Sequence, residues 1–271
     1  MFDSLQQLGS KADRLLLYSD RLDIGDEETG EGRLLAKARD ELGVNLQPVK
    51  VLHEKSADYS GPNWADSYTK LLAFNQTQYS RVVVIDSDSL LLGSLDELFF
   101  VPPAVAAMPR AYWLSTPQMA SHVMVLTPST EAFNDVQRTI QRNAGYGFYD
   151  MEVMNKVFGR TCQVIPYEPY ALLTGEFGRD EHATFLGSRS GHGKDPWDAE
   201  VVLRGSKMVH FSDYPLPKPW LMTDEQIVNA KPDCSFYSEP GKECRAQQIW
   251  VDLYRTFKEK RLVSDNPDAN K

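Results

Sequence analysis

Asp86 and Asp88 stand one residue apart, and this spacing is the clearest sign of chemistry in the sequence. They follow Val82–Ile85, a short β-branched run whose pattern predicts a buried parallel strand. The carboxyl end of such a strand is where α/β proteins bind ligands, and a turn beginning there can direct both carboxylates to one ion. Hard carboxylate oxygens suit Mg²⁺ or Mn²⁺, which commonly carry substrate phosphates. The pair therefore predicts an enzyme that handles a nucleotide diphosphate, and a pair that only caps a turn fits the tripeptide equally well.

A second informative segment spans residues 209–220, with the sequence Val-His-Phe-Ser-Asp-Tyr-Pro-Leu-Pro-Lys-Pro-Trp. His210 lies near the end of a predicted strand, and its neutral imidazole suits a divalent ion already held by two carboxylates. A proline-rich turn then leads to Lys218, whose ammonium group offers a point charge for a diphosphate. Taken alone, a histidine and lysine of this kind are more often structural. Together with Asp86 and Asp88 they predict a metal and diphosphate site.

The composition is that of an ordinary folded protein and gives no sign of a nucleic-acid partner. The chain has 271 residues, 42% hydrophobic and 25% charged, enough for one large domain or two small ones. Its net charge of -9 and its lack of a long Lys/Arg cluster argue against nucleic-acid binding. It has no run of about 18 apolar residues, so we expect no membrane span in this chain. Residues 1–8 predict an amphipathic helix fragment rather than a signal peptide.

The apolar periodicity predicts an α/β chain. Strands and helices alternate in its first part, which favours a mainly parallel sheet with right-handed crossovers. The strands expected there are 12–18, 45–51 and 82–85, and the helices are 33–42 and one from residue 62. Later strands are expected at 104–108, 122–126, 163–165 and 207–211, and later helices at 130–143, 150–158 and 246–258. Residues 174–200 are expected to form a loop rich in Gly and His.

The three cysteines bear on the cellular compartment. Cys162 precedes apolar residues and is expected to enter a core strand. Cys234 and Cys244 bracket a loop rich in Ser, Pro and Gly, and their short spacing permits a disulfide, which would imply an oxidising compartment. Two free thiols fit the sequence equally well.

Three blocks of sequence carry a resemblance to a known family. The first contains Tyr-Thr-Lys-Leu at 68–71, Gln-Tyr-Ser-Arg-Val-Val-Val-Ile-Asp-Ser-Asp-Ser-Leu-Leu-Leu at 78–92 and Leu-Asp-Glu-Leu-Phe at 95–99. The second contains Val-Leu-Thr-Pro-Ser-Thr-Glu-Ala-Phe at 125–133 and Tyr-Asp-Met-Glu-Val-Met-Asn at 149–155, and the third spans residues 210–220. In order and spacing these blocks resemble glycosyltransferase family 8, the retaining sugar transferases that include glycogenin and galactinol synthase. The third block, with Leu-Leu-Thr-Gly-Glu-Phe at 172–177, is most similar to the fungal α-N-acetylglucosaminyltransferase branch.

The resemblance implies a GT-A type, Rossmann-like α/β fold, with a mixed, mostly parallel sheet flanked by helices. One domain is expected over residues 1–262, followed by a polar tail at 263–271. The family opens with a strand ahead of the helix at which this sequence begins, so we expect a domain truncated at its amino terminus and lacking the first strand. The expected location is the Golgi lumen or secretory pathway if the full-length protein has an upstream membrane anchor, and the cytoplasm otherwise.

The resemblance also implies Mn²⁺, a UDP-sugar donor and a glycan acceptor. The expected metal ligands are Asp86, Asp88 and His210. Lys218 falls on the family's diphosphate-binding lysine, and Lys70 falls on a donor-contacting lysine. With the serine between the two aspartates, the expected donor-binding residues are Lys70, Asp86, Ser87, Asp88, His210 and Lys218.

The expected catalytic residues are two acids on one predicted helix. Asp150 falls on the acidic residue near the reacting sugar, although a helix cap fits it as well, and Glu152 follows without a family counterpart. Two places depart from glycogenin-type chains, because Ser121-His122 replaces Asn-Gly and Met151 replaces Gln. These departures predict different contacts to the donor sugar.

The resulting hypothesis is a Mn-dependent retaining glycosyltransferase that moves a sugar, best matched by N-acetylglucosamine, from a UDP-sugar to a glycan hydroxyl. Asp150 or Glu152 would orient the acceptor or stabilise the oxocarbenium-like centre. The alternatives are a non-catalytic nucleotide-sugar-binding remnant and a haloacid-dehalogenase-type phosphatase with Asp86 as nucleophile. The phosphatase motif normally opens its chain and needs a downstream acid pair, and this sequence has neither feature.

Overall fold

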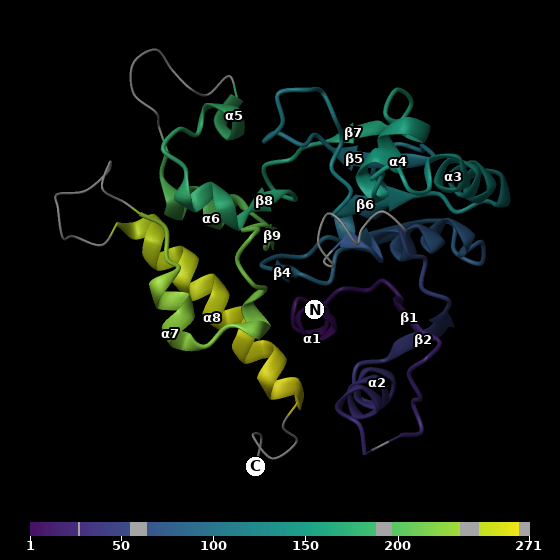
Figure 1. Ribbon diagram of the computed structural model, residues 1–271, viewed down its shortest axis with the longest axis horizontal. Helices are drawn as coiled ribbons and strands as arrows, with labels where there is room; N and C mark the ends of the chain where they lie inside the picture. Colours follow the sequence, from purple (N-terminus) through teal and green to yellow (C-terminus); the bar gives the residue numbers. More distant parts are fainter. Residues whose placement is uncertain (27, 55–63, 188–196, 234–243, 266–271) are drawn as a thin grey trace. The chain divides into compact units, whose positions relative to one another are not determined.

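The computed structural model describes residues 1–26, 28–54, 64–187, 197–233 and 244–265, which fall into two compact units (Figure 1). The amino-terminal unit contains Phe2–Asp86 and Ser94–Pro166. The carboxy-terminal unit contains Met1, Ser87–Gly93 and Tyr167–Lys271. The chain therefore first passes from the amino-terminal unit to the other between Asp86 and Ser87, inside the Asp-Ser-Asp motif.

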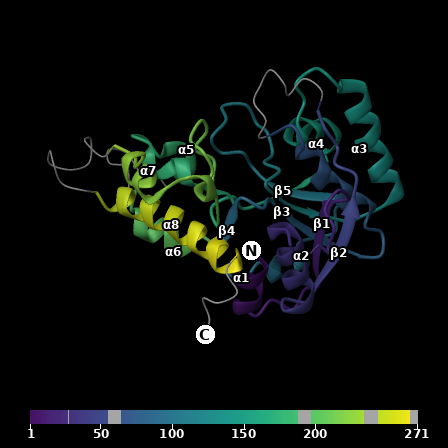
Figure 2. The ribbon, with the colours of Figure 1, turned by 60° about the horizontal axis from the view of Figure 1, so that its bottom comes forward.

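The amino-terminal unit opens with a short helix and a strand–helix–strand motif. α1 (Phe2–Gln7) precedes β1 (Arg14–Ser19), which pairs in parallel with β2 (Val44–Val49). α2 (Gly30–Asp40) connects the two strands (Figure 2). Thr29 begins this helix because its hydroxyl accepts a backbone N–H that has no partner within the first turn. These elements confirm the alternation predicted for the first fifty residues.

A four-stranded sheet follows in the same unit. Its order is β3 (Val82–Ile85), β6 (Val123–Leu126), β5 (Ala106–Pro109) and β7 (Gln163–Ile165). β6 is antiparallel to both β3 and β5, whereas β5 and β7 are parallel. The prediction of a buried parallel strand at Val82–Ile85 was therefore wrong in two respects. β3 is antiparallel to its partner and only partly buried, because it is the outermost strand of this sheet among the described residues.

Helices on this sheet supply the core of the amino-terminal unit. α3 (Thr130–Asn143) and α4 (Asp150–Phe158) have the bounds predicted from their periodicity, and η3 (Ser67–Asn75) is a 3₁₀ helix where an α-helix was expected. A shorter 3₁₀ segment, η4 (Asp96–Phe100), precedes β5 in the chain. The largest core side chains come from η3, the sheet and α4: Tyr68, Leu71, Phe74, Met108, Met124, Leu126, Met154 and Phe158.

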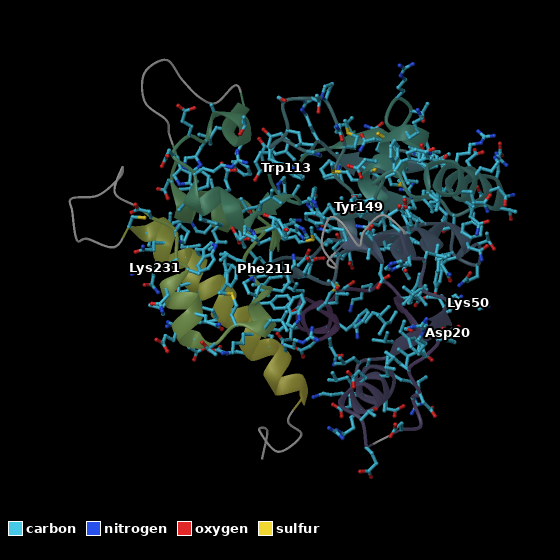
Figure 3. The ribbon with its side chains drawn as sticks, viewed as in Figure 1. Asp20, Lys50, Trp113, Tyr149, Phe211 and Lys231 are labelled. Carbon is cyan, nitrogen blue, oxygen red and sulfur yellow. The ribbon has the colours of Figure 1, made fainter. Side chains whose placement is uncertain are left out.

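The carboxy-terminal unit is built around a three-stranded sheet and a long helix. The order is β4 (Ser89–Leu91), β9 (Met208–His210) and β8 (Leu172–Leu173), with β9 antiparallel to β4 and parallel to β8. α8 (Arg245–Asp265) contributes an aromatic row, and its Tyr254 packs edge-on against Phe211, which is fully buried (Figure 3). The polar tail predicted after residue 262 overlaps the end of α8, and residues 266–271 lie outside the described part.

The segment 174–200 contains more regular structure than its composition predicted. It includes η5 (Thr174–Gly178), α5 (Ala183–Leu186) and the start of α6 (Ala199–Gly205). The loop prediction was wrong because helices this short show little periodicity, and one of them depends on a cap. The Asp198 carboxylate accepts two backbone N–H groups at the start of α6. Two further short helices, η7 (Pro219–Leu221) and α7 (Asp224–Asn229), complete the unit.

The fold class is the predicted one, α/β with mixed strands flanked by helices, but the expected predominance of parallel strands is not found in the described part of the chain. Across the described strands, three pairs are parallel and three are antiparallel. Each helix among the described residues is too short or too polar to cross a bilayer. Cys162 is a free, half-buried thiol and Cys244 is disulfide-bonded, while Cys234 lies outside the described residues.

Replacing Phe74 tests the core of the amino-terminal unit. Phe74 is fully buried and stacks on Phe158 with ring centroids 5.2 Å apart. We expect Phe74→Ala to lower the free energy of unfolding by about 3–5 kcal/mol, measured by urea denaturation, because it leaves a cavity. Phe100→Ala is the matched control, since that ring is 85% exposed and its loss should change stability by less than about 0.5 kcal/mol. Equal effects of the two substitutions would contradict the packing.

Candidate active site

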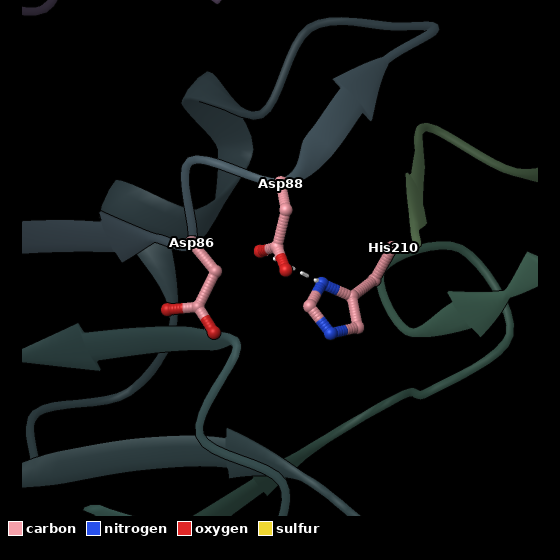
Figure 4. A group of neighbouring side chains, drawn as sticks. All are labelled: Asp86, Asp88 and His210. Carbon is pink, nitrogen blue, oxygen red and sulfur yellow. Dashed lines mark ion pairs between the residues drawn. The ribbon is translucent and has the colours of Figure 1, made fainter. Parts of the chain in front are cut away.

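The carboxy-terminal unit brings Asp88 and His210 together although they are far apart in the sequence. Ser89 of β4 lies opposite His210 of β9 in the antiparallel ladder, and the Phe211 N–H donates to the Asp88 carbonyl at 3.0 Å. The ladder therefore sets the two side chains side by side. The His210 Nδ1 atom lies 3.4 Å from Asp88 Oδ1 and 3.3 Å from the Ser89 hydroxyl (Figure 4).

Lys218 completes this half of the site, after the proline-rich turn. Its Nζ donates to Asp88 Oδ2 and to the carbonyl oxygen of Phe211, both at 2.6 Å. Burial alone would raise the pKa of Asp88, but the charges of His210 and Lys218 outweigh it and hold that pKa below its usual value. Asp88 is therefore an anion at neutral pH, as a metal ligand must be.

The amino-terminal unit holds the other half of the site around Lys70. Asp86 directly follows β3, and its N–H donates to the carbonyl oxygen of His122 at 2.9 Å. Lys70, from η3, contacts Asp86 Oδ1 at 2.7 Å and Oδ2 at 2.9 Å. The same ammonium group lies 2.6 Å from Asp150 Oδ2. One lysine thus bridges two carboxylates, and these carboxylates raise the pKa of Lys70 against the lowering effect of its burial.

Asp150 is the first residue of α4, where the helix dipole favours a negative charge. It is buried, and the Ser121 hydroxyl donates to its Oδ2 at 2.5 Å. Burial would raise the pKa of Asp150, but the charge of Lys70 and hydrogen bonds from Lys70, Ser121 and Ser67 lower it overall. Asp150 is therefore an ionised carboxylate held by several donors.

Glu152 and Ser87 are the remaining predicted site residues. The Glu152 Oε2 atom accepts the backbone N–H of Tyr149 at 2.9 Å, which is the contact of a helix cap. The expected capping role of Asp150 thus belongs to Glu152. Ser87 is exposed and links the two aspartates.

Two serines that contact Asp150 were not predicted as functional residues. In the sequence, Ser121 was identified only as a departure from glycogenin-type chains, and nothing indicated a role for Ser67. One feature of the sequence could have indicated Ser121 as a site residue. It lies just ahead of the buried strand β6, and the neighbouring strand β3 directly precedes Asp86. Its pairing with Asp150 depends on the sheet and α4 packing together, which local sequence does not encode.

The fold has a counterpart among solved structures. The structure is similar to that of the galactosyltransferase LgtC, solved with donor and acceptor sugar analogues, with a TM-score of 0.54 and 13% identity over 94% of this chain and 89% of that one. At this identity the likeness concerns the fold alone. The fold is therefore that of the GT-A glycosyltransferases, as predicted.

Sequence comparison gives the family. A glucose N-acetyltransferase 1 of Gibberella zeae is 42% identical over 95% of this chain and 56% of its own length. A glucose N-acetyltransferase 1 of Aspergillus fumigatus is 38% identical over 97% of this chain and 72% of its own length. The chain belongs to this fungal family and spans about half to three quarters of the length of these two relatives. No protein-family profile matches it.

The charge on Asp150 predicts how acid should affect stability. Because the folded pKa of Asp150 lies below its unfolded value of about 3.9, its stabilising contribution is present above that pH and is lost as the pH falls through the folded pKa. We expect Asp150→Asn to be less stable than wild type at pH 6 by about 1–3 kcal/mol. The difference, measured by urea denaturation, should shrink below about pH 4. A difference that grows on acidification would contradict this assignment.

Proposed function

We propose that this chain carries an N-acetylglucosaminyltransferase activity that moves N-acetylglucosamine from a UDP-sugar to a hydroxyl group of a glycan. Two observations support the sugar and the reaction. The relatives are named glucose N-acetyltransferases, a name that contains both glucose and an N-acetyl group, and the fold resembles that of a galactosyltransferase. The observation that carries the proposal is the position of Asp88 between His210 and Lys218. It supports a site in which one carboxylate contacts both a candidate metal ligand, His210, and a candidate phosphate-binding cation, Lys218.

The donor set of the motif fits a divalent cation. Asp86, Asp88 and His210 offer two carboxylates and one imidazole, a combination that suits Mn²⁺ better than the softer thiolate-binding metals. We infer that these three residues would together bind one such ion. When bound, Mn²⁺ would act as a Lewis acid that stabilises the negative charge of the departing UDP.

The chain's own residues supply the remaining functions. Lys218 and Lys70 each place an ammonium group beside a motif aspartate, where a diphosphate would find a second positive charge. Asp150 is ionised and fixed, so it can accept a hydrogen bond from a sugar hydroxyl or stabilise positive charge at the reacting carbon. Because Glu152 caps α4, the catalytic role falls to Asp150. We propose retention of configuration, on the resemblance to family 8.

The disulfide at Cys244 bears on the location of the reaction. Disulfides persist in oxidising compartments and are rare in the cytosol. The bonded state of Cys244 therefore favours the Golgi lumen or another part of the secretory pathway over the cytoplasm.

Membership of the family leaves the phosphatase hypothesis without support, and the complete set of acids and lysines favours an enzyme over a non-catalytic remnant.

Asp88→Asn tests the metal and donor site. The amide is a poorer ligand and carries no charge, so Mn²⁺-dependent release of UDP from UDP-N-acetylglucosamine should fall on the order of 100-fold or more. UDP-glucose and UDP-galactose serve as competing donors in the same screen. Asp252→Asn, an exposed carboxylate on α8, is the matched control and should retain full activity. Undiminished UDP release by Asp88→Asn would refute the assignment.

Asp150→Asn tests the catalytic assignment separately from donor binding. The variant should bind UDP and Mn²⁺ in calorimetry much as wild type does, while kcat falls on the order of 10² to 10³ because a fixed charge near the reacting carbon is lost. Glu152→Gln should keep most of its turnover, since that side chain caps a helix. The opposite ranking of the two variants would assign catalysis to Glu152.

A further inference from the structure

Asp213 is a carboxylate in the middle of the loop between His210 and Lys218, and the proposed reaction does not use it. Three neutral donors converge on its Oδ2 atom. The Tyr254 hydroxyl donates at 2.7 Å, the Trp250 indole Nε1 donates at 3.3 Å, and the Thr174 hydroxyl is in closer contact still. The donors come from α8 and from the start of η5, so one carboxylate ties the loop to two elements of its own unit.

The donors themselves are buried and closely packed. Tyr254 and Trp250 are each 1% exposed, stand one helical turn apart on α8 and stack with ring centroids 3.9 Å apart. Thr174 is fully buried. Hydrogen bonds made by buried donors are strengthened by the low local dielectric, and leaving such donors without a partner is costly. The loop is therefore attached to side chains that belong to the packed interior of the unit.

The same contacts reach the backbone of the metal-binding strand. The Thr174 hydroxyl lies 3.3 Å from the carbonyl oxygen of His210 and accepts the N–H of Ser212 at 3.2 Å. Gly175 allows the Asp213 side chain to lie close to the backbone of η5, since a Cβ atom at Gly175 would lie 3.3 Å from Asp213 Oδ1, tighter than an ordinary contact. Because the Thr174 hydroxyl gives its one hydrogen to Asp213, it holds the chain leaving His210 through the N–H of Ser212.

We propose that Asp213 is a positioning residue that fixes the loop from His210 to Lys218 in the conformation where both side chains meet Asp88. The imidazole lies before Asp213 and the lysine after it, and both contact Asp88 in the same unit. Loss of the Asp213 contacts frees the loop, so the imidazole and the ammonium group no longer reach one carboxylate together. This inference rests on the proposed metal and donor site for its functional consequence.

The experiment compares wild type with Asp213→Asn and Tyr254→Phe. Asp224→Asn is the matched control, because Asp224 is an exposed aspartate of the same unit that pairs with Lys258 at 2.7 Å. Mn²⁺ affinity in the presence of UDP is measured from the electron paramagnetic resonance signal of free Mn²⁺. Amide hydrogen exchange over residues 208–220 is followed by mass spectrometry. KM and kcat are determined on UDP-N-acetylglucosamine.

We expect Asp213→Asn to weaken Mn²⁺ binding by about tenfold to 100-fold, the usual effect of losing a residue that orients a metal ligand. Exchange over residues 208–220 should accelerate, and KM for the donor should rise more than kcat falls. Tyr254→Phe removes one donor and keeps the ring stack, so it should show a smaller effect in the same direction. Asp224→Asn should match wild type in every measurement.

Unchanged Mn²⁺ affinity and unchanged exchange in Asp213→Asn would overturn the inference. If that variant fails to fold, Tyr254→Phe decides, and wild-type exchange and affinity in it would likewise overturn the inference. A wild-type chain that binds no Mn²⁺ contradicts the proposed function instead. The exchange comparison still tests the fixing of the loop in that case, because it needs no metal.

Discussion

Both aspartates of the Asp-Ser-Asp motif are partly buried anions, and each depends on a lysine of its own unit. Lys70 neutralises Asp86 in the amino-terminal unit, and Lys218 neutralises Asp88 in the carboxy-terminal unit. A carboxylate removed from water without such a partner would be protonated or would cost several kcal/mol. Each lysine therefore stabilises the charge of its aspartate, with His210 beside the Asp88 pair in one unit and Asp150 beside Lys70 in the other.

Much of the local structure was predictable because it follows from periodicity and caps. The bounds of α3, α4 and β7 match their predictions, and Ser129 caps α3 through the N–H of Ala132. Strand direction was less predictable. β3 has the apolar run of a buried parallel strand, yet it lies antiparallel to β6 at the outer position of its sheet. An apolar run carries no information on which strand lies alongside, and its burial depends on the position of the strand in the sheet.

The candidate site was likewise predictable only in part. Asp88, His210 and Lys218 could be predicted as one group because metal and phosphate chemistry requires those residue types, and the structure places them together in one unit. The Ser121–Asp150 contact and the donors around Asp213 could not be predicted. They join residues from separate elements, and serine, threonine and tyrosine hydroxyls are too common in sequence to mark a site. Residue type therefore identified the candidate site residues, whereas the hydroxyl groups that hydrogen-bond to Asp150 and Asp213 are set by packing between elements.

The state of Asp150 limits the chemistry it can perform. Lys70 and Ser121 both direct hydrogen atoms at its carboxylate, and the folded protein lowers its pKa. An acid kept ionised in this way has no proton to give at neutral pH, so it cannot act as a general acid toward a leaving group. In the proposed reaction its roles would be to accept a hydrogen bond from a sugar hydroxyl or to stabilise positive charge at the reacting carbon. Protonation of the leaving group would then not be required of this carboxylate, because the proposed leaving group, UDP, would depart as a stable anion whose charge a lysine beside the motif and a bound divalent ion would stabilise.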